Sequence, residues 1–347
     1  LGLELLALSS YALVALNRDS VMGSEAGMKY FILGSLASGI LLFGMSLIYG
    51  ATGTLALNEI AASLANGAGD TLLLSFGLAF VVVGVAFKLG AVPFHMWLPD
   101  VYQGAPAAIT LLISSLPKLG YLALIIRMLE DGMGSMHSDW QAMLVVLAAL
   151  SMILGNVVAI AQTNIKRMLG YSTISHVGFI LLGVLAATPE GYAAAMFYTI
   201  VYAIMSAGAF AVMILLTREG IEAENLDDFK GLAKRSPWFA LMMLMIMFSL
   251  AGIPVFVGFF AKWQVIAAAI GAGFIGLAIL AVVTAVIGAF YYLRIVKLMY
   301  FDEPESSEAV TAPLDFQVML SVNGLAMIVL GLFSGGLISV CVSSFGA

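Results

Sequence analysis

The chain has 347 residues, of which 62% are hydrophobic and 10% are charged, with a net charge of -6 and a mean hydropathy of +1.08. A soluble domain carries about 25% charged residues, so this composition excludes an aqueous fold and indicates a polytopic membrane protein. The single cysteine, Cys341, excludes a disulfide within the chain and any cysteine-based cluster or zinc site. No run of Lys and Arg suggests a nucleic-acid partner.

Ten apolar segments are long enough to cross a membrane as helices. They lack the alternating polarity of transmembrane β-strands, so we expect an all-α polytopic fold with short loops. The chain begins with Leu1 and Glu4 inside an apolar segment, and we expect further residues upstream. The ten segments are 1–16, 28–50, 71–92, 106–129, 140–162, 166–187, 191–217, 237–268, 272–299 and 315–342.

The 14 Lys and Arg residues divide unevenly between alternate loops. The positive-inside rule places the loops with the excess on the cytoplasmic or matrix side. With ten spans, both ends of the chain are then predicted on the opposite side. Arg127 lies near a span end on that opposite side. The basic loops hold Arg18, Lys29, Lys166, Arg167, Arg218, Lys230, Lys234, Arg235, Arg294 and Lys297.

The three remaining lysines, Lys88, Lys118 and Lys262, lie within apolar segments, as do Glu4 and His176. An ionisable side chain at membrane depth costs about 2.5–3.5 kcal/mol on insertion scales and usually marks an ion or proton path. Simpler interpretations remain for each of these residues. A lysine near a helix end can snorkel to the headgroups, Glu4 can be an interface residue, and His176 can be a hydrogen-bonded core residue.

The spacing of these residues predicts an internal repeat. Glu4 and Lys88 are followed by His176 and Lys262 at shifts of 172 and 174 residues. An odd number of spans per repeat inverts the second copy, as in ion transporters with discontinuous helices near the midplane. We therefore predict inverted five-helix repeats at 1–130 and 131–300, the first lacking its first helix. A C-terminal linker and final transmembrane helix follow at 301–347.

Helix breakers accompany two of the lysines. Pro93 follows Lys88, whereas Gly252 and Pro254 precede Lys262. Proline removes a backbone donor, and freed backbone groups are tolerated at membrane depth only within protein or beside water. We expect two discontinuous helices whose lysines find water and polar partners. Simple kinking is the alternative, because Pro and Gly are common in membrane helices.

Three stretches resemble a known family: FKLGAVPFHMWLPDVYQGAP (87–106), QTNIKRMLGYSTISHVGF (162–179) and SLAGIPVFVGFFAKW (249–263). They closely resemble the subunit N family of bacterial NADH-quinone oxidoreductase (complex I), over essentially the whole chain. Subunits L and M and the Mrp-type antiporters share the lysine, VP and WLPD elements. In those relatives WLPD is typically followed by an AH-containing stretch rather than DVYQGAP. Family members usually have fourteen helices, so the chain resembles helices five to fourteen.

The resemblance implies an antiporter-like, proton-translocating subunit of the respiratory chain in a bacterial inner membrane. Glu4 and Lys88 match the ion pair of a first half channel. Lys118 matches a central relay lysine, His176 a polar relay position and Lys262 the lysine of a second half channel. The resemblance implies no redox centre, metal or cofactor on this chain. Flavin, iron–sulfur clusters and quinone would belong to other subunits, and a neighbouring antiporter-like subunit and small membrane subunits are the expected partners.

Six further residues are predicted to assist the pathway: His95, Asp100, Tyr171, Ser172, Ser175 and Tyr292. His95 and Asp100 are expected either to cap and orient a half-helix or to feed in protons from the cytoplasmic side. Two other functions stay open. One is a subunit of an Mrp-type Na⁺/H⁺ antiporter that uses the same lysines. The other is a membrane scaffold whose charges only hold helices together.

Overall fold

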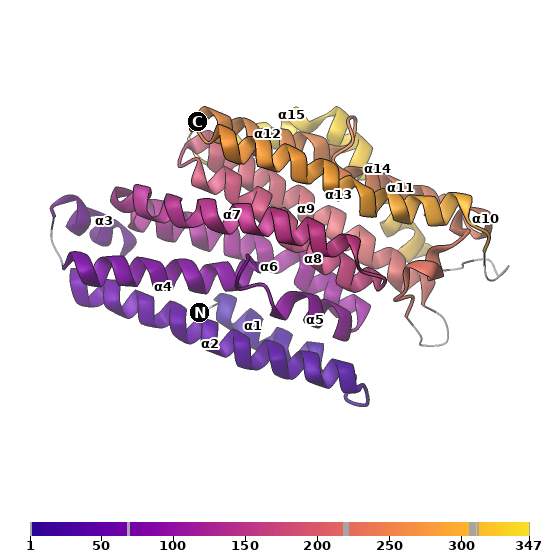
Figure 1. The fold of residues 1–347 in the computed structure, drawn as a ribbon, viewed down its shortest axis with the longest axis horizontal. Helices are drawn as coiled ribbons and strands as arrows, with labels where there is room; N and C mark the ends of the chain where they lie inside the picture. Colours follow the sequence, from indigo (N-terminus) through magenta and orange to yellow (C-terminus); the bar gives the residue numbers. More distant parts are fainter. Residues whose placement is uncertain (1, 68–69, 218–221, 305–309, 311, 347) are drawn as a thin grey trace.

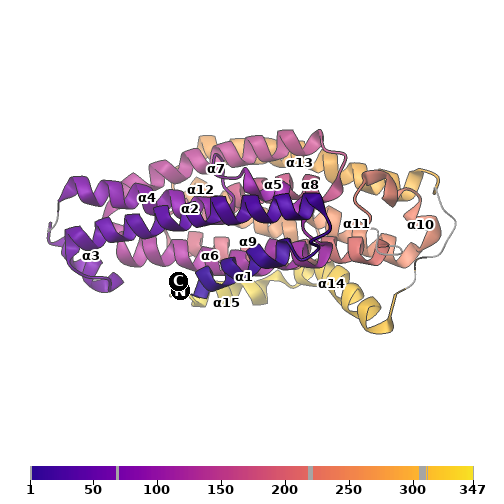
Figure 2. The same ribbon diagram turned by 90° about the horizontal axis from the view of Figure 1, so that it is seen from below.

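The computed structural model describes residues 2–67, 70–217, 222–304, 310 and 312–346. Over these residues the chain is a bundle of α-helices, and the expected all-α fold is confirmed. The long helices run side by side along one direction in both views (Figures 1 and 2). Of the basic residues counted from the sequence, Arg218 lies outside the described residues.

Eight helices in the described part of the chain are long and apolar enough to span a membrane. Two consecutive shorter helices, α11 (Pro237–Ala251) and α12 (Val257–Gly271), form a further segment, and α1 (Gly2–Val14) matches the first predicted one. All ten predicted segments therefore correspond to helical structure. The eight long helices are α2 (Val21–Thr52), α4 (Thr71–Leu89), α6 (Ala107–Ile126), α7 (His137–Ile160), α8 (Ile165–Leu185), α9 (Pro189–Leu216), α13 (Ile275–Phe301) and α14 (Leu314–Leu332).

The sequence-based prediction is wrong in two details. The segment 315–342 is interrupted at Phe333, after which α15 (Ser334–Ser343) begins, and the glycines at 335 and 336 weaken a continuous helix there. The helix α3 (Leu57–Ala65) was not predicted, because nine residues are too few to span a membrane. Short elements complete the chain: α5 (Trp97–Gly104), η1 (Arg127–Gly132), η2 (Gly134–Met136), η3 (Leu226–Phe229) and α10 (Leu232–Arg235).

The first predicted helix break separates α4 from α5. Gly90 ends α4 with a left-handed φ of 82°, a conformation that glycine adopts without steric cost. The indole Nε1 of Trp97 donates to the carbonyl of Phe87 at 2.9 Å. The backbone N–H of Val92 donates to Ser151 Oγ on α7, also at 2.9 Å. Side chains thus satisfy backbone groups that the break frees, as membrane depth requires.

The second predicted break separates α11 from α12 and is also confirmed. Gly252 has a φ of 85° and ends α11, while Val255 in the connection has a φ of 83°. The N–H of Gly258, in the first turn of α12, donates to Ser249 Oγ at 3.1 Å. The two breaks differ in one respect, because the buried lysine precedes the first break and follows the second. The division into repeats at 130 and 300 stays a prediction.

Glycines set the close approach of α7 and α8. A β-carbon on Gly155 would lie 2.6 Å from Ser175 N and 2.8 Å from Tyr171 O. A β-carbon on Gly178 would lie 2.9 Å from the carbonyl of Ala148. Small residues let backbones touch in this way, which drives helix association where the lipid supplies no hydrophobic force. This contact fixes the position of α8, which carries His176.

We predict that Gly155→Ala destabilises the protein. The added methyl group meets backbone atoms of α8 that cannot rotate away, and overpacking of this kind costs about 1–3 kcal/mol. Gly50→Ala is the matched control, since no atom lies within 4 Å of a β-carbon at that position. Thermal unfolding in detergent should show a lower midpoint for the first variant and an unchanged or higher one for the second. Equal midpoints for both variants would contradict the packing role of Gly155.

Candidate functional site

The residues singled out from the sequence lie inside the helix bundle. The exposed fractions are 6% for Lys88, 2% for Lys118, 9% for Lys262 and 3% for His176. They lie on α4, α6, α12 and α8, and Glu4 lies on α1. The helix α6 packs against α1, α4 and α9, and α8 packs against α9 and α12. The ionisable groups therefore follow one another through the bundle from helix to helix.

An ion pair occupies one end of this row. Lys88 Nζ lies 2.6 Å from Glu4 Oε1, and Ser38 on α2 bridges both groups. The hydroxyl of Ser38 donates to Glu4 Oε2 at 2.7 Å and accepts from Lys88 Nζ at 3.1 Å. The Glu4 side chain keeps 31% exposure, whereas that of Lys88 keeps 5%. Ser38 was not predicted, because a lone serine in an apolar helix has no distinguishing pattern.

Lys118 stands alone in the middle of α6. No residue in the described ranges forms an ion pair or hydrogen bond with its ammonium group, although the side chain is almost fully buried. Tyr121, three residues further along α6, lies with its ring centroid 6.0 Å from Lys88 Nζ. The helix α6, which packs against α1 and α4, thus carries a buried lysine that has no hydrogen-bond or ion-pair partner among the described residues.

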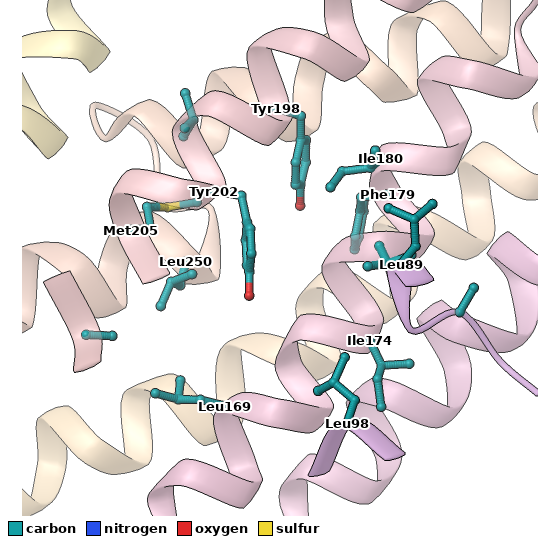
Figure 3. Close-up of a cluster of buried hydrophobic side chains, with 14 of the residues drawn as sticks. Leu89, Leu98, Leu169, Ile174, Phe179, Ile180, Tyr198, Tyr202, Met205 and Leu250 are labelled. Carbon is teal, nitrogen blue, oxygen red and sulfur yellow. The ribbon is translucent and has the colours of Figure 1, made fainter. Parts of the chain in front are cut away.

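His176 is the centre of a hydroxyl cluster. Its Nδ1 lies 2.8 Å from the hydroxyl of Tyr198 and its Nε2 lies 2.9 Å from the hydroxyl of Tyr292. The Tyr292 hydroxyl also bonds to Ser172 Oγ. The ring of Tyr202 is tilted by 42° against the imidazole, with ring centroids 4.9 Å apart. Figure 3 shows Tyr198 and Tyr202 on one helix with both hydroxyls pointing the same way.

Lys262 lies beside the second helix break. Its Nζ donates to the carbonyls of Leu250 and Ala251 at 3.0 and 2.8 Å. These carbonyls belong to the last turn of α11, where four carbonyls have no partner within the helix and the dipole is negative. Lys262 Nζ also lies 5.3 Å from the ring centroid of Phe179 on α8. The lysine therefore finds its partners in the broken helix itself rather than in a carboxylate.

Of the three predicted auxiliary residues on α8, Tyr171 and Ser175 lie outside the His176 cluster. Ser175 accepts from Asn156 Nδ2 at 2.8 Å, and Asn156 in turn accepts from the Tyr291 hydroxyl at 2.9 Å. The guanidinium of Arg167 lies over the ring of Tyr171, with 5.8 Å between the Arg167 Cζ atom and the ring centroid. Ser172 and Tyr292, in contrast, belong to the cluster itself.

Asp100 and His95 lie on the far side of the first break. Asp100 accepts from Lys29 Nζ at 2.8 Å and from Arg167 at 2.6 Å. The expectation that Asp100 caps a helix is wrong, because Met96 is the N-cap of α5 and no side chain caps it. The carboxylate instead links α5 to α2 and α8 by ion pairs. The buried Nδ1 of His95 has no hydrogen-bond partner among the described residues.

The sequence analysis missed several buried hydroxyls on α9 and α6. Ser206 Oγ donates to Ser114 Oγ at 2.8 Å, and the Tyr202 hydroxyl bonds to Thr173 at 2.6 Å. A signal was available, because Tyr198, Tyr202 and Ser206 recur every four residues and so share one helix face. A cavity of about 10 Å³ adjoins them, close to the smallest that holds one water. Its lining residues are Leu169, Ser172, Tyr202, Ser206, Ala209, Phe210 and Leu250.

Comparison with known proteins shows the family to which the chain belongs. Residues 1–288 match the family model described as NADH:quinone oxidoreductase/Mrp antiporter, TM. The NADH-quinone oxidoreductase subunit N of Thioalkalivibrio sulfidiphilus is 63% identical over 340 residues, which cover 98% of this chain and 71% of that protein.

Two solved structures share the fold. A chain of respiratory complex I from Thermus thermophilus with bound aureothin is 33% identical, with a TM-score of 0.84 over 97% of this chain and 73% of that chain. A chain of the Mrp complex from Dietzia sp. is 27% identical, with a TM-score of 0.87 over 99% of this chain and 72% of that chain. The chain therefore belongs to the NADH:quinone oxidoreductase/Mrp antiporter family of membrane subunits, and within it to the NADH-quinone oxidoreductase subunit N group.

Proposed function

We propose that the chain is a proton-translocating membrane subunit of respiratory NADH:quinone oxidoreductase, with no redox chemistry of its own. The observation that carries this proposal is the row of buried ionisable groups from Glu4 and Lys88 through Lys118 and His176 to Lys262. Buried lysines are costly in a membrane and are kept where they move or bind ions. The single cysteine of the sequence leaves no set of thiolates to hold an iron–sulfur cluster.

The Glu4–Lys88 pair is the element that responds to a neighbouring subunit. Opposite charges about 4 Å apart interact by about 4 kcal/mol at an effective dielectric constant of about 20. A charge change outside the chain that draws Glu4 away therefore weakens the hold of Lys88 on its proton. Glu4 is partly exposed, so it can sense such a change. The released proton passes to Lys118, for which the described part of the chain offers no competing partner.

His176 is built to pass a proton through its ring. Each imidazole nitrogen faces a tyrosine hydroxyl, so the ring can accept at one nitrogen and release from the other. Tyr292 and Ser172 extend this connection toward the cavity beside Leu250, whose carbonyl accepts from Lys262. Lys262 is then the last carrier before the far surface.

The partners and the orientation follow from the same proposal. Figures 1 and 2 place α10 and α3 at opposite ends of the bundle. We assign the end with α10 and the basic loops to the cytoplasm, which places both ends of the described chain on the periplasmic side of a bacterial inner membrane. The partners are the other membrane subunits of the complex, including a neighbouring antiporter-like subunit, and flavin, iron–sulfur clusters and quinone belong elsewhere in it.

The sequence identities favour this function over an Mrp-type Na⁺/H⁺ antiporter. The subunit N relative is 63% identical, whereas the Mrp chain with the same fold is 27% identical. The motif DVYQGAP at 100–106 also favours the oxidoreductase subunit. Purification of the protein with its native partners distinguishes the two functions. Only the proposed function predicts NADH dehydrogenase subunits in the preparation.

We predict that Lys118→Ala in the assembled complex uncouples this subunit. NADH oxidation should continue at a reduced rate. The number of protons moved per NADH should fall by the number that this subunit normally translocates. The measurement is proton uptake into sealed vesicles against NADH consumption. An unchanged proton ratio would show that the lysine row is not the path. Failure to assemble, seen on a native gel for Lys118→Met as well, would support the scaffold function instead.

We also predict that Tyr292→Phe lowers the proton ratio without loss of assembly. The change removes the hydroxyl that joins His176 to Ser172 and leaves the ring packing in place. Tyr192→Phe is the matched control, because the hydroxyl of Tyr192 donates to Glu130 at 2.6 Å, away from the row. Normal pumping in the first variant would exclude the tyrosine from the route.

A further inference from the structure

Trp97 connects the two sides of the first helix break. It is the first residue of α5 and is 3% exposed. Its indole Nε1 donates at 2.9 Å to the carbonyl of Phe87, which immediately precedes Lys88 in the last turn of α4. The same carbonyl accepts from the N–H of Gly90 at 3.0 Å, so the indole fills its second acceptor position. The hydrogen bond of Trp97 therefore ties α5 to the helical turn that carries Lys88.

The ring of Trp97 also contacts a second helix. It lies almost parallel to the ring of Tyr30 on α2, with centroids 4.6 Å apart and 8° between the ring planes. Tyr30 in turn meets Tyr11 of α1 edge to face, with centroids 4.6 Å apart and 83° between the planes. All three rings are buried, and aromatic rings attract one another specifically in such geometries. This aromatic triad of Tyr11, Tyr30 and Trp97 therefore fixes α1, α2 and α5 relative to one another.

The aromatic triad and the ion pair use the same faces of α1 and α2. On α2, Tyr30, Gly34 and Ser38 recur every four residues, and Ser38 donates to Glu4. On α1, Glu4 precedes Tyr11 by seven residues, which is two helical turns. A β-carbon on Gly34 would overlap the Tyr11 hydroxyl, so this glycine allows the two helices to meet there. On both helices the triad thus lies about 10–12 Å along the axis from the ion pair.

The helix α5 contacts α2 at two further points. Asp100, three residues after Trp97, accepts from Lys29 Nζ of α2 at 2.8 Å. A β-carbon on Gly104, the last residue of α5, would lie 2.8 Å from the carbonyl of Met22. Because these contacts do not involve the indole, we expect α5 to stay on α2 when Trp97 is changed. A variant of Trp97 then tests the link from α5 to α4 and the ring stack, rather than the docking of α5.

We propose that Trp97 is a positioning residue for the ion pair that starts the proposed proton route. The proposal deepens the proposed function and rests on it. The indole N–H of Trp97 holds the turn of Lys88, and its stacked ring holds the helices that carry Ser38 and Glu4. Hydrogen bonds weaken steeply as their distance and angle depart from the optimum, so a shift of α4 against α1 and α2 would break this set of contacts. Trp97 itself neither takes nor gives a proton.

A purely structural role for Trp97 makes a different prediction. Trp140 is also buried, at 0% exposure, and its indole Nε1 likewise donates to a backbone carbonyl, that of Met133 at 3.3 Å. It belongs to α7 and is not part of the aromatic triad. If Trp97 only stabilised the fold, Trp97→Phe and Trp140→Phe would both lower the thermal midpoint, and neither would change the proton ratio.

The test uses the assembled complex in sealed vesicles, with protons moved per NADH oxidised as the readout. Trp97→Phe removes the indole N–H and keeps an aromatic ring, whereas Tyr30→Leu removes the stacked ring. Tyr30→Phe is the rescue variant, because it restores that ring, and Trp140→Phe is the matched control. Glu4→Gln, alone and combined with Trp97→Phe, shows whether the tryptophan acts through the ion pair.

We expect Trp97→Phe and Tyr30→Leu to lower the proton ratio by up to the loss seen in Glu4→Gln. Tyr30→Phe and Trp140→Phe should keep the full ratio. Adding Trp97→Phe to Glu4→Gln should cause no further loss, because no ion pair is left to position. An additive loss in this double variant, or a full ratio in Glu4→Gln alone, would overturn the positioning role.

Lys118→Ala separates this proposal from the proposed function. A full ratio in Trp97→Phe beside an impaired Lys118→Ala would overturn only the positioning role. A full ratio in Lys118→Ala would overturn both. If Trp97→Phe does not assemble on a native gel, the contrast between Tyr30→Leu and Tyr30→Phe decides, and equal ratios in these two variants would overturn the positioning role.

Discussion

A charge inside a membrane is costly unless polar groups or water surround it, and this constraint explains the surroundings of two of the three buried lysines singled out above. Lys262 is held by carbonyls that exist as acceptors only because α11 ends at Gly252. Lys88 is held by Glu4 and Ser38, which α1 and α2 carry. The second helix break and the positions of α1 and α2 are therefore conditions for these two lysines.

The two breaks solve this problem in different ways. Lys88 lies before its break and pairs with a carboxylate on another helix, a partner that can move or change its charge. Lys262 lies after its break and bonds to backbone carbonyls, which keep their partial charge. A proton carrier with a movable partner suits the start of a proton route, and a carrier with fixed partners suits its end. Under the proposed function, this difference between the partners would give the row a direction.

The proposed route crosses helices rather than following one. The helix α9 supplies Tyr198, Tyr202 and Ser206, which lie between the lysine of α6 and the histidine of α8. The close contact of α7 with α8 at Gly155 keeps His176 in register with Tyr292 of α13. Packing by small residues and proton transfer thus depend on the same helices, because hydrogen bonds near 2.8 Å tolerate little displacement.

The sequence by itself determined the all-α fold, the ten helical segments, the two breaks and the buried lysines, because apolar length, prolines and isolated charges act locally. It did not determine the interruption at Phe333, the role of Asp100 or the hydroxyls of Ser38, Ser114 and Ser206. These depend on which helix faces meet, and serine is common on apolar helices whether or not it has a partner. Only the tertiary structure brought residues as far apart as Ser114 and Ser206 within hydrogen-bonding distance, because helix packing rather than local propensity sets that contact.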